Sequence, residues 1–363
     1  MKRGEIVAEI GPSEKNPRNS EGSFIDLKNG KIMFAYSKFI GESGSDDAKA
    51  LIAARFSEDG GLTWSDDKTL FKPEDFNALN IMSTSMVRLH NDDICLFFVI
   101  RYGWHDTRPF LFRSKDEGNT WEKPVCCAHG PGYYVTNNDR IVLLKNGRLI
   151  LPTAFHRMRG DHITRWNSFD GRGIPVLFYS DDNGYTWKES ENYAYVSIPG
   201  SKSGMQEAGV LELYENCLWQ WFRTDLGCQY QSFSHDNGLS WSIPEPSRYT
   251  SPQSPMSVKR IPHTGDLLAV YNPQPRFDGR WFSKAGDRTP LVYSISRDNG
   301  KSKSIPVIIE DDFDSGYCYI AIHFTESAVL LAYCAGSVND GGCLNRLRMR
   351  RIEYNDLYDN LSL

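Results

Sequence analysis

A short motif that recurs five times constrains the fold of this chain more than any other feature. The motif reads S-x-D-x-G-x-S/T-W, and its copies begin at Ser57, Ser114, Ser180, Ser234 and Ser296. These serines are 57, 66, 54 and 62 residues apart (57→114→180→234→296). A repeat of this size predicts one supersecondary unit that is stacked several times over a continuous core.

Each residue type in the motif has a mechanical role in a turn. The Asp side chain accepts hydrogen bonds from nearby backbone N–H groups, and the glycine supplies a position with positive φ. The tryptophan is large enough to pack between neighbouring units, although the last copy has Lys303 in its place. A calcium loop needs more oxygen ligands in a longer segment, so we predict a structural turn and neither a metal nor a cofactor.

The segments between the motif copies contain short apolar runs separated by Gly- or Asn-bearing turns. The first unit shows this pattern at Ile32–Tyr36 and Ala50–Phe56, and a sixth unit without the motif opens at Tyr317. Short strands in six repeats predict an all-β, six-bladed β-propeller that forms a single domain over residues 1–363. We expect Glu5–Ile10 to supply the outer strand of the last blade and so to close the ring.

Composition narrows the classes of partner. The formal net charge is −5, which does not indicate a nucleic-acid partner, and no run approaches the ~18 apolar residues of a membrane span. The N-terminus as written lacks the apolar segment of a signal peptide, which predicts a cytoplasmic protein, or a secreted or periplasmic one if the N-terminus was trimmed. The eight cysteines show no metal-binding spacing, and nothing in the sequence indicates the oligomeric state.

Polar residues gather at positions that open at one mouth of a propeller. The first strand of each blade begins there and the second strand ends there. The residues at these positions and in the adjoining loops include Glu21, Asp46, Asp47, Arg101, Arg140, His156, Glu207, Arg223, Arg288 and Tyr317. Because an unpaired charge beside an apolar strand is costly, this ring predicts a binding site at that mouth.

The motif copies and the order of these residues resemble the Asp-box exo-α-sialidases. Glu207 and Arg223 stand 16 residues apart (223 − 207) on a predicted hairpin, and Arg288 lies just before the fifth motif. The last blade opens with Gly316-Tyr317-Cys318-Tyr319. The resemblance implies Tyr317, or alternatively Tyr319, as nucleophile with Glu207 as its base. It also implies Asp47 or Asp46 as general acid/base and Arg223 with Arg288 as a carboxylate clamp.

The chemistry of sialic acid explains this combination. Its anomeric carbon carries a carboxylate, which repels a carboxylate nucleophile, so a neutral tyrosine activated by a glutamate suits the reaction better. Arginines bind the substrate carboxylate through charge-assisted hydrogen bonds. The resemblance therefore implies a retaining, metal-independent exo-glycosidase that removes terminal sialic acid from a glycan or glycoconjugate. Trp104 and Trp166 are candidates for a wall on which the sugar stacks.

Two features depart from the sialidase pattern. The first-blade arginine of that family has no counterpart in Asn19–Phe24, where Glu21 stands and Arg18 is out of register, and the late glutamate is absent from Leu331–Cys334. Arg140 or Arg101 would then complete the clamp, and His156 would contact a substrate hydroxyl. Alternatively the substrate is a uronic, ulosonic or deoxy sugar, or the protein is a glycan-binding propeller without catalysis.

Overall fold

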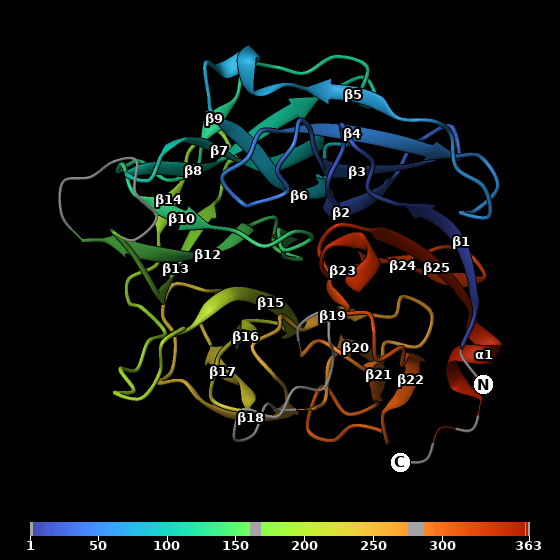
Figure 1. The fold of residues 1–363 in the computed structure, drawn as a ribbon. Helices are drawn as coiled ribbons and strands as arrows, with labels where there is room; N and C mark the ends of the chain where they lie inside the picture. Colours follow the sequence, from blue (N-terminus) through green and yellow to red (C-terminus); the bar gives the residue numbers. More distant parts are fainter. Residues whose placement is uncertain (1–2, 160–167, 275–286, 360, 362–363) are drawn as a thin grey trace.

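The computed structural model describes residues 3–159, 168–274, 287–359 and 361. Their regular secondary structure is almost entirely β-strand, and the strands are gathered in sheets around a common centre (Figure 1). The first sheet contains β2 (Asn19–Asp26), β3 (Ile32–Phe39), β4 (Ala50–Ser57) and β5 (Lys68–Phe71). Its order, β2-β3-β4-β5, is that of an antiparallel meander.

The second sheet is larger, with nine strands. It contains β6 (Asn80–Arg88), β7 (Ile94–Gly103), β8 (Asp106–Ser114), β9 (Val125–Cys126), β10 (Tyr133–Val135), β11 (Val142–Leu143), β12 (Leu149–Met158), β13 (Phe169–Ser180) and β14 (Lys188–Glu189). The short strand β10 pairs with β8 on one side and with β12 on the other. It thereby joins the second and third predicted units into one sheet.

The three remaining sheets each have four strands. One contains β15 (Gln206–Tyr214), β16 (Cys217–Arg223), β17 (Cys228–Ser234) and β18 (Glu245–Thr250). The next contains β19 (Ser257–Arg260), β20 (Leu267–Tyr271), β21 (Leu291–Ser296) and β22 (Val307–Glu310). The last contains β23 (Cys318–Phe324), β24 (Ala328–Cys334), β25 (Leu347–Glu353) and β1 (Glu5–Ile10), and helix α1 (Tyr354–Tyr358) follows β25.

The predicted all-β propeller class is confirmed, and so is the pairing of the N-terminal strand with the last sheet. Strand β1 pairs with β25, so the first and last strands of the chain lie in one sheet (Figure 1). The innermost strands contact each other around the centre: β2 contacts β6 and β23, and β19 contacts β15 and β23. The blade number of six and the single-domain boundary stay predictions.

The repeated motif forms the predicted turn. In the third copy, Asp182 Oδ1 accepts hydrogen bonds from the Ser180 hydroxyl (2.8 Å) and the Thr186 amide (2.9 Å). The Thr186 hydroxyl donates to Asp182 Oδ2 (2.6 Å), and Gly184 has a φ of 86°. Trp187 is buried against Phe97 and Leu149 of the nine-stranded sheet. The motif is therefore a local staple whose tryptophan contributes to the core.

The fifth copy forms the same turn, but the residue that packs beside it is a lysine instead of a tryptophan. Lys303 replaces tryptophan, and its Nζ lies 3.2 Å from the hydroxyl of Tyr271 and 5.7 Å from the ring centroids of Tyr249 and Tyr271. A cation over two aromatic rings thus takes the place of an indole.

Candidate functional site

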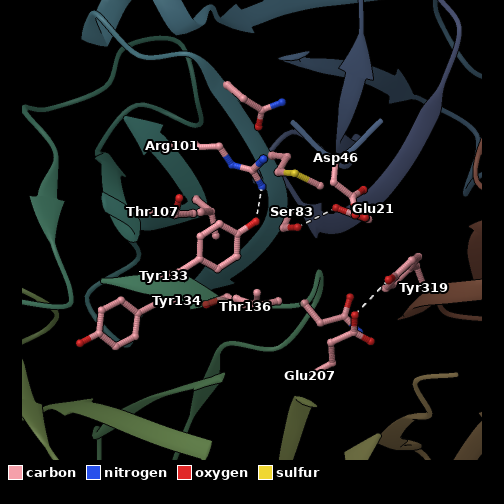
Figure 2. Close-up of a pocket in the computed structure, with 15 residues that line it drawn as sticks. Glu21, Asp46, Ser83, Arg101, Thr107, Tyr133, Tyr134, Thr136, Glu207 and Tyr319 are labelled. Atoms are coloured by element: carbon pink, nitrogen blue, oxygen red, sulfur yellow. Dashed lines mark hydrogen bonds between the residues drawn. The ribbon is translucent and has the colours of Figure 1, made fainter. Parts of the chain in front are cut away.

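The innermost strands carry the candidate site on a recurrent backbone irregularity. Strands β2, β6, β15 and β23 each have a bulge near their first residues, where the pairing register shifts. One residue in each bulge has positive φ: Glu21 (57°), Ser83 (64°), Glu207 (46°) and Tyr319 (58°). A bulge re-aims the side chain that it contains. All four of these side chains line a common cavity (Figure 2).

The bulge decides which tyrosine faces the cavity. Tyr319 lines it, whereas Tyr317 is 1% exposed and packs in the core with its ring centroid 6.3 Å from that of Tyr333. Burial raises the pKa of Tyr317 to about 12. The placement of Tyr317 at the mouth is therefore corrected, because Tyr319, the alternative, occupies the bulge position that corresponds to Glu207.

Tyr319, Glu207 and Arg223 form a connected triad of side chains. The Tyr319 hydroxyl donates to Glu207 Oε1 (3.0 Å), and Arg223 Nη1 donates to the same oxygen (2.6 Å). Arg223 Nη1 also lies 3.4 Å from the Tyr319 hydroxyl oxygen. Burial and the charge of Glu207 together hold the pKa of Tyr319 well above its usual value, although both Arg223 and Arg288 oppose this shift. The phenol is thus a neutral hydroxyl whose proton points at a carboxylate.

Arg288 approaches the same tyrosine from the loop before β21. Its Cζ lies 5.4 Å from the Tyr319 ring centroid, and its Nη1 donates to the sulfur of Cys318 (2.9 Å). Its backbone carbonyl accepts a hydrogen bond from Asn272, which anchors the loop. Arg288 and Arg223 line one chamber, as predicted for a pair that binds one anion.

Asp46 reaches the cavity from the loop between β3 and β4, with a side chain that is 66% exposed. Its Oδ1 accepts from Arg18 Nη1 (2.6 Å). Burial pushes the pKa of Asp46 upward, but the charge and hydrogen bond of Arg18, together with the charges of Arg101 and Arg223, outweigh it, so that this pKa lies below its usual value. Asp47 is also exposed, and its Oδ1 accepts from Ser45. Asp46 lines the cavity, and Asp47 is not among the described lining residues.

Arg18 is a functional neighbour whose role sequence reasoning missed. It is 1% exposed and donates to Glu21 Oε1 (2.8 Å) as well as to Asp46, while Ser83 donates to Glu21 Oε2 (2.6 Å). Burial raises the pKa of Glu21, and the charge of Arg18 opposes that shift. Arg18 is therefore a buried cation that forms ion pairs with both Glu21 and Asp46.

The other predicted site residues separate into two groups. His156 and Arg101 line the cavity. Burial lowers the pKa of His156 to about 4, and its Nδ1 lies 3.0 Å from the Asp170 carbonyl. Arg140 instead donates to Ser257 and to the Met256 carbonyl between the inner strands, and burial lowers its pKa to about 10. Arg140 does not line the cavity within the described ranges, so its predicted place at the mouth is corrected.

The cavity has two connected parts that share Asp46, Tyr133, Val135, Glu207 and Tyr319. The main chamber, of about 500 Å³, is lined additionally by Trp104, His156, Phe169, Gln206, Arg223 and Arg288. The side chamber, of about 80 Å³, is lined additionally by Glu21, Asn80, Met82, Ser83, Val99, Arg101, Thr136 and Asn137. The main chamber is large enough for a sugar ring. Trp166, the second candidate stacking residue, lies outside the described residues.

A recurring sequence signal marks the bulge residues in retrospect. Each is followed two positions later by a small residue at which regular pairing resumes: Ser23, Ser85, Gly209 and Ala321. When Ala321 is aligned with Gly209, Tyr319 and not Tyr317 stands at the position equivalent to Glu207.

Residues 30–330 match the BNR repeat-like domain, which covers most of the chain. The chain belongs to the BNR repeat-like family. None of the curated proteins matches this member of the family in sequence.

Solved structures share the fold of this BNR repeat-like protein at low sequence identity. A protein of unknown function from Dyadobacter fermentans is 18% identical with a TM-score of 0.70, over 96% of this chain and 99% of that one. The Hadza microbial sialidase Hz136 is 15% identical with a TM-score of 0.71, over 93% of this chain and 66% of that one. The leech intramolecular trans-sialidase is 14% identical with a TM-score of 0.71, over 98% and 71%. These structural likenesses establish a shared fold.

Among the described residues, no group of three or more His, Cys, Asp or Glu side chains is placed to hold a metal ion. In the same part of the chain, no helix has the length and apolar character needed to cross a membrane.

Proposed function

We propose that this protein is a retaining exo-glycosidase that removes a terminal sugar acid of the sialic acid type from a glycoconjugate. The observation that carries the proposal is the hydrogen bond from the Tyr319 hydroxyl to Glu207, with Arg223 bound to the same carboxylate oxygen. A phenol paired with a carboxylate beside cationic side chains is a nucleophile suited to an anomeric carbon that carries a negative charge.

Tyr319 and Glu207 perform the first half of the reaction. Glu207 accepts the proton of Tyr319, and the phenolic oxygen forms a bond to the anomeric carbon. The bond between that carbon and the leaving oxygen breaks, and Asp46 donates a proton to the leaving oxygen. Water then attacks the tyrosyl intermediate with Asp46 as base, which releases the sugar and returns the proton from Glu207 to Tyr319.

Arg223 and Arg288 orient the substrate through its carboxylate. Both line the main chamber next to Tyr319, and Arg223 Nε has no hydrogen-bond partner among the described residues. Charge-assisted hydrogen bonds from guanidinium groups to a carboxylate are stronger than neutral ones. The predicted two-arginine clamp thus has donors available for a substrate anion.

A second candidate is the same reaction on a different sugar, such as a uronic, another ulosonic or a deoxy sugar. It is favoured by Glu21, a carboxylate at the cavity wall, and by Arg18, which is 1% exposed and paired with that carboxylate and Asp46. Arg18 is therefore not presented to a substrate anion as a third clamp member.

The test is turnover of 4-methylumbelliferyl N-acetylneuraminic acid by wild type, Tyr319→Phe and Tyr317→Phe. We expect Tyr319→Phe to lose turnover by roughly a thousandfold or more, because it lacks the nucleophilic oxygen. Tyr317→Phe is the matched control and should stay within about threefold of wild type, since its ring lies in the core. Equal turnover by Tyr319→Phe and wild type would overturn the tyrosyl mechanism. Hydrolysis of another fluorogenic sugar acid but not of the sialoside would select the second candidate.

A further inference from the structure

Arg101 lies in the side chamber, away from the two clamp arginines. It comes from the end of β7, is 5% exposed, and donates through Nη2 to the Tyr133 hydroxyl (2.6 Å; Figure 2). Its Nε and Nη1 groups have no hydrogen-bond partner among the described residues. Arg223 and Arg288 line the main chamber, and the described lining of the side chamber includes neither.

A buried guanidinium without a carboxylate partner is costly, because its charge has left water. Arg101 has no ion pair within the described part of the chain, and its Cζ lies over the rings of Tyr133 (5.3 Å) and Trp104 (5.4 Å). Contacts of this kind offset only part of the cost of burial. The arrangement therefore favours a ligand that brings negative charge to Nε and Nη1.

The other cations and carboxylates of the chamber already have partners. Glu21 and Asp46 accept from Arg18, and Glu207 accepts from Arg223. The direct ion pairs of these carboxylates are thus made to arginines other than Arg101, whose charge acts on Asp46 without a direct ion pair among the described residues. The Nε and Nη1 donors of Arg101 are therefore available to a bound group.

The size and lining of the side chamber limit what this group is. A single water requires roughly 10–15 Å³, so a chamber of about 80 Å³ holds a substituent of a few heavy atoms and not a second sugar ring. The Asn137 Nδ2 and the Thr136 hydroxyl also line it and lack partners among the described residues. With Arg101 they offer an oxyanion a set of donors.

We propose that the side chamber is an oxyanion subsite, in which Arg101 binds a second acidic substituent, a sulfate ester or a carboxylate, of the sugar in the main chamber. This substrate class rests on the proposed function, because it places the sugar by its reaction at Tyr319. The substituent lies in the side chamber, whereas the carboxylate held by Arg223 and Arg288 lies in the main chamber; the residues that line both chambers, such as Glu207 and Tyr319, stand between them.

The first test is calorimetric titration with inorganic sulfate at constant ionic strength. Wild type, Arg101→Leu and Arg101→Gln are compared, with Arg108→Leu as the matched control. Arg108 is an arginine of β8 that is paired with Asp106 and is not among the described lining residues. We expect both Arg101 variants to weaken sulfate binding at least tenfold and Arg108→Leu to leave it unchanged. An Arg288→Leu variant should retain the Arg101-dependent binding, which separates the subsite from the clamp.

A measurement of sulfate binding to wild type itself uses the Arg101→Gln variant only to assign one signal. In a ¹⁵N-detected arginine spectrum, the Nε signal that disappears in Arg101→Gln should shift on addition of sulfate. Equal sulfate affinity in wild type and both Arg101 variants, or an unmoved Arg101 signal, overturns the subsite. Sulfate binding requires no turnover, so failure of the fluorogenic assay would contradict the proposed reaction while leaving this result intact.

The second test concerns the substrate. Competition for turnover by a sugar acid and by its sulfated counterpart should favour the sulfated ligand at least tenfold in wild type but not in Arg101→Leu. No preference for the sulfated ligand in wild type overturns the assignment of the substituent.

Discussion

The hydroxyl oxygen of Tyr319 lies 3.0 Å from Oε1 of Glu207, although 112 residues separate the two in the chain. Both residues occupy bulges with positive φ at the start of innermost strands, β23 and β15. Each bulge turns its side chain out of the regular alternation and into the cavity. The pairing of a phenol with its base thus depends on the same local irregularity used twice.

Asp46 and Asp47 provide a test of the general acid. Asp46→Asn should lower turnover of a natural glycoside by about 10²–10⁴-fold, because an alcohol leaves poorly without a proton. The loss should be smaller with 4-methylumbelliferol, which is a better leaving group. Asp47→Asn is the control and should preserve both rates; the reverse pattern would transfer the role to Asp47.

The pH dependence of turnover should reflect the lowered pKa of Asp46, to which Arg18 contributes. The pKa of Asp46 is lowered, so the protonated form that donates a proton becomes scarcer as pH rises from the acid range to neutrality. We expect turnover of the natural glycoside to decline over that interval. Rates measured at fixed ionic strength from pH 4 to 8 check this, and a profile that rises steadily with pH would contradict it.

Arg18 should matter for stability through Glu21. Arg18→Met leaves a buried carboxylate without its cation and is expected to cost about 3–5 kcal/mol of unfolding free energy. The double variant Arg18→Met with Glu21→Gln should recover much of this loss, since no buried charge then remains unpaired. Urea denaturation measures both values. Equal stability of the single and double variants would show that lost packing, and not charge, dominates.

His156 should make the protein less stable in acid. Its pKa is about 4 in the folded state and about 6.5 in a typical unfolded chain, so the unfolded state binds more protons between these values. The contribution of His156 is therefore complete above pH 6.5 and is lost as pH falls toward 4, by about 3 kcal/mol. His156→Gln should flatten this part of the stability curve, as measured by urea denaturation from pH 4 to 7. An unchanged slope in the variant would contradict the assignment.

Replacing the last residue of the motif should destabilise the protein by different amounts in different copies. Trp187→Ala should destabilise the protein by about 3–5 kcal/mol, because the indole is 3% exposed in the core. Lys303→Ala, at the equivalent position of the fifth copy, should cost about 1 kcal/mol, the scale of its cation–π contacts. Thermal unfolding of the two variants compares them, and equal losses would contradict the packing argument.

The sequence by itself determined the features that depend on near neighbours. The Asp turn joins residues four positions apart, and the apolar runs and their spacing predicted an all-β propeller whose N-terminal strand pairs with the last sheet. The hairpin that carries Glu207 and Arg223 was predictable for the same reason, because both side chains stand on adjacent paired strands. Local hydrogen bonding and strand alternation are written in the order of the residues.

Only the tertiary structure decided which side chains meet at the mouth. In a regular strand Tyr317 and Tyr319 would point to the same face, but the bulge at Tyr319 turns this side chain into the cavity while Tyr317 lies in the core. Arg18 could be placed only once the loop carrying Asp46, 28 residues away, had been packed against it. Arg101 and its chamber likewise require separate inner strands to converge. Such contacts arise from packing between distant segments, and no local pattern encodes them.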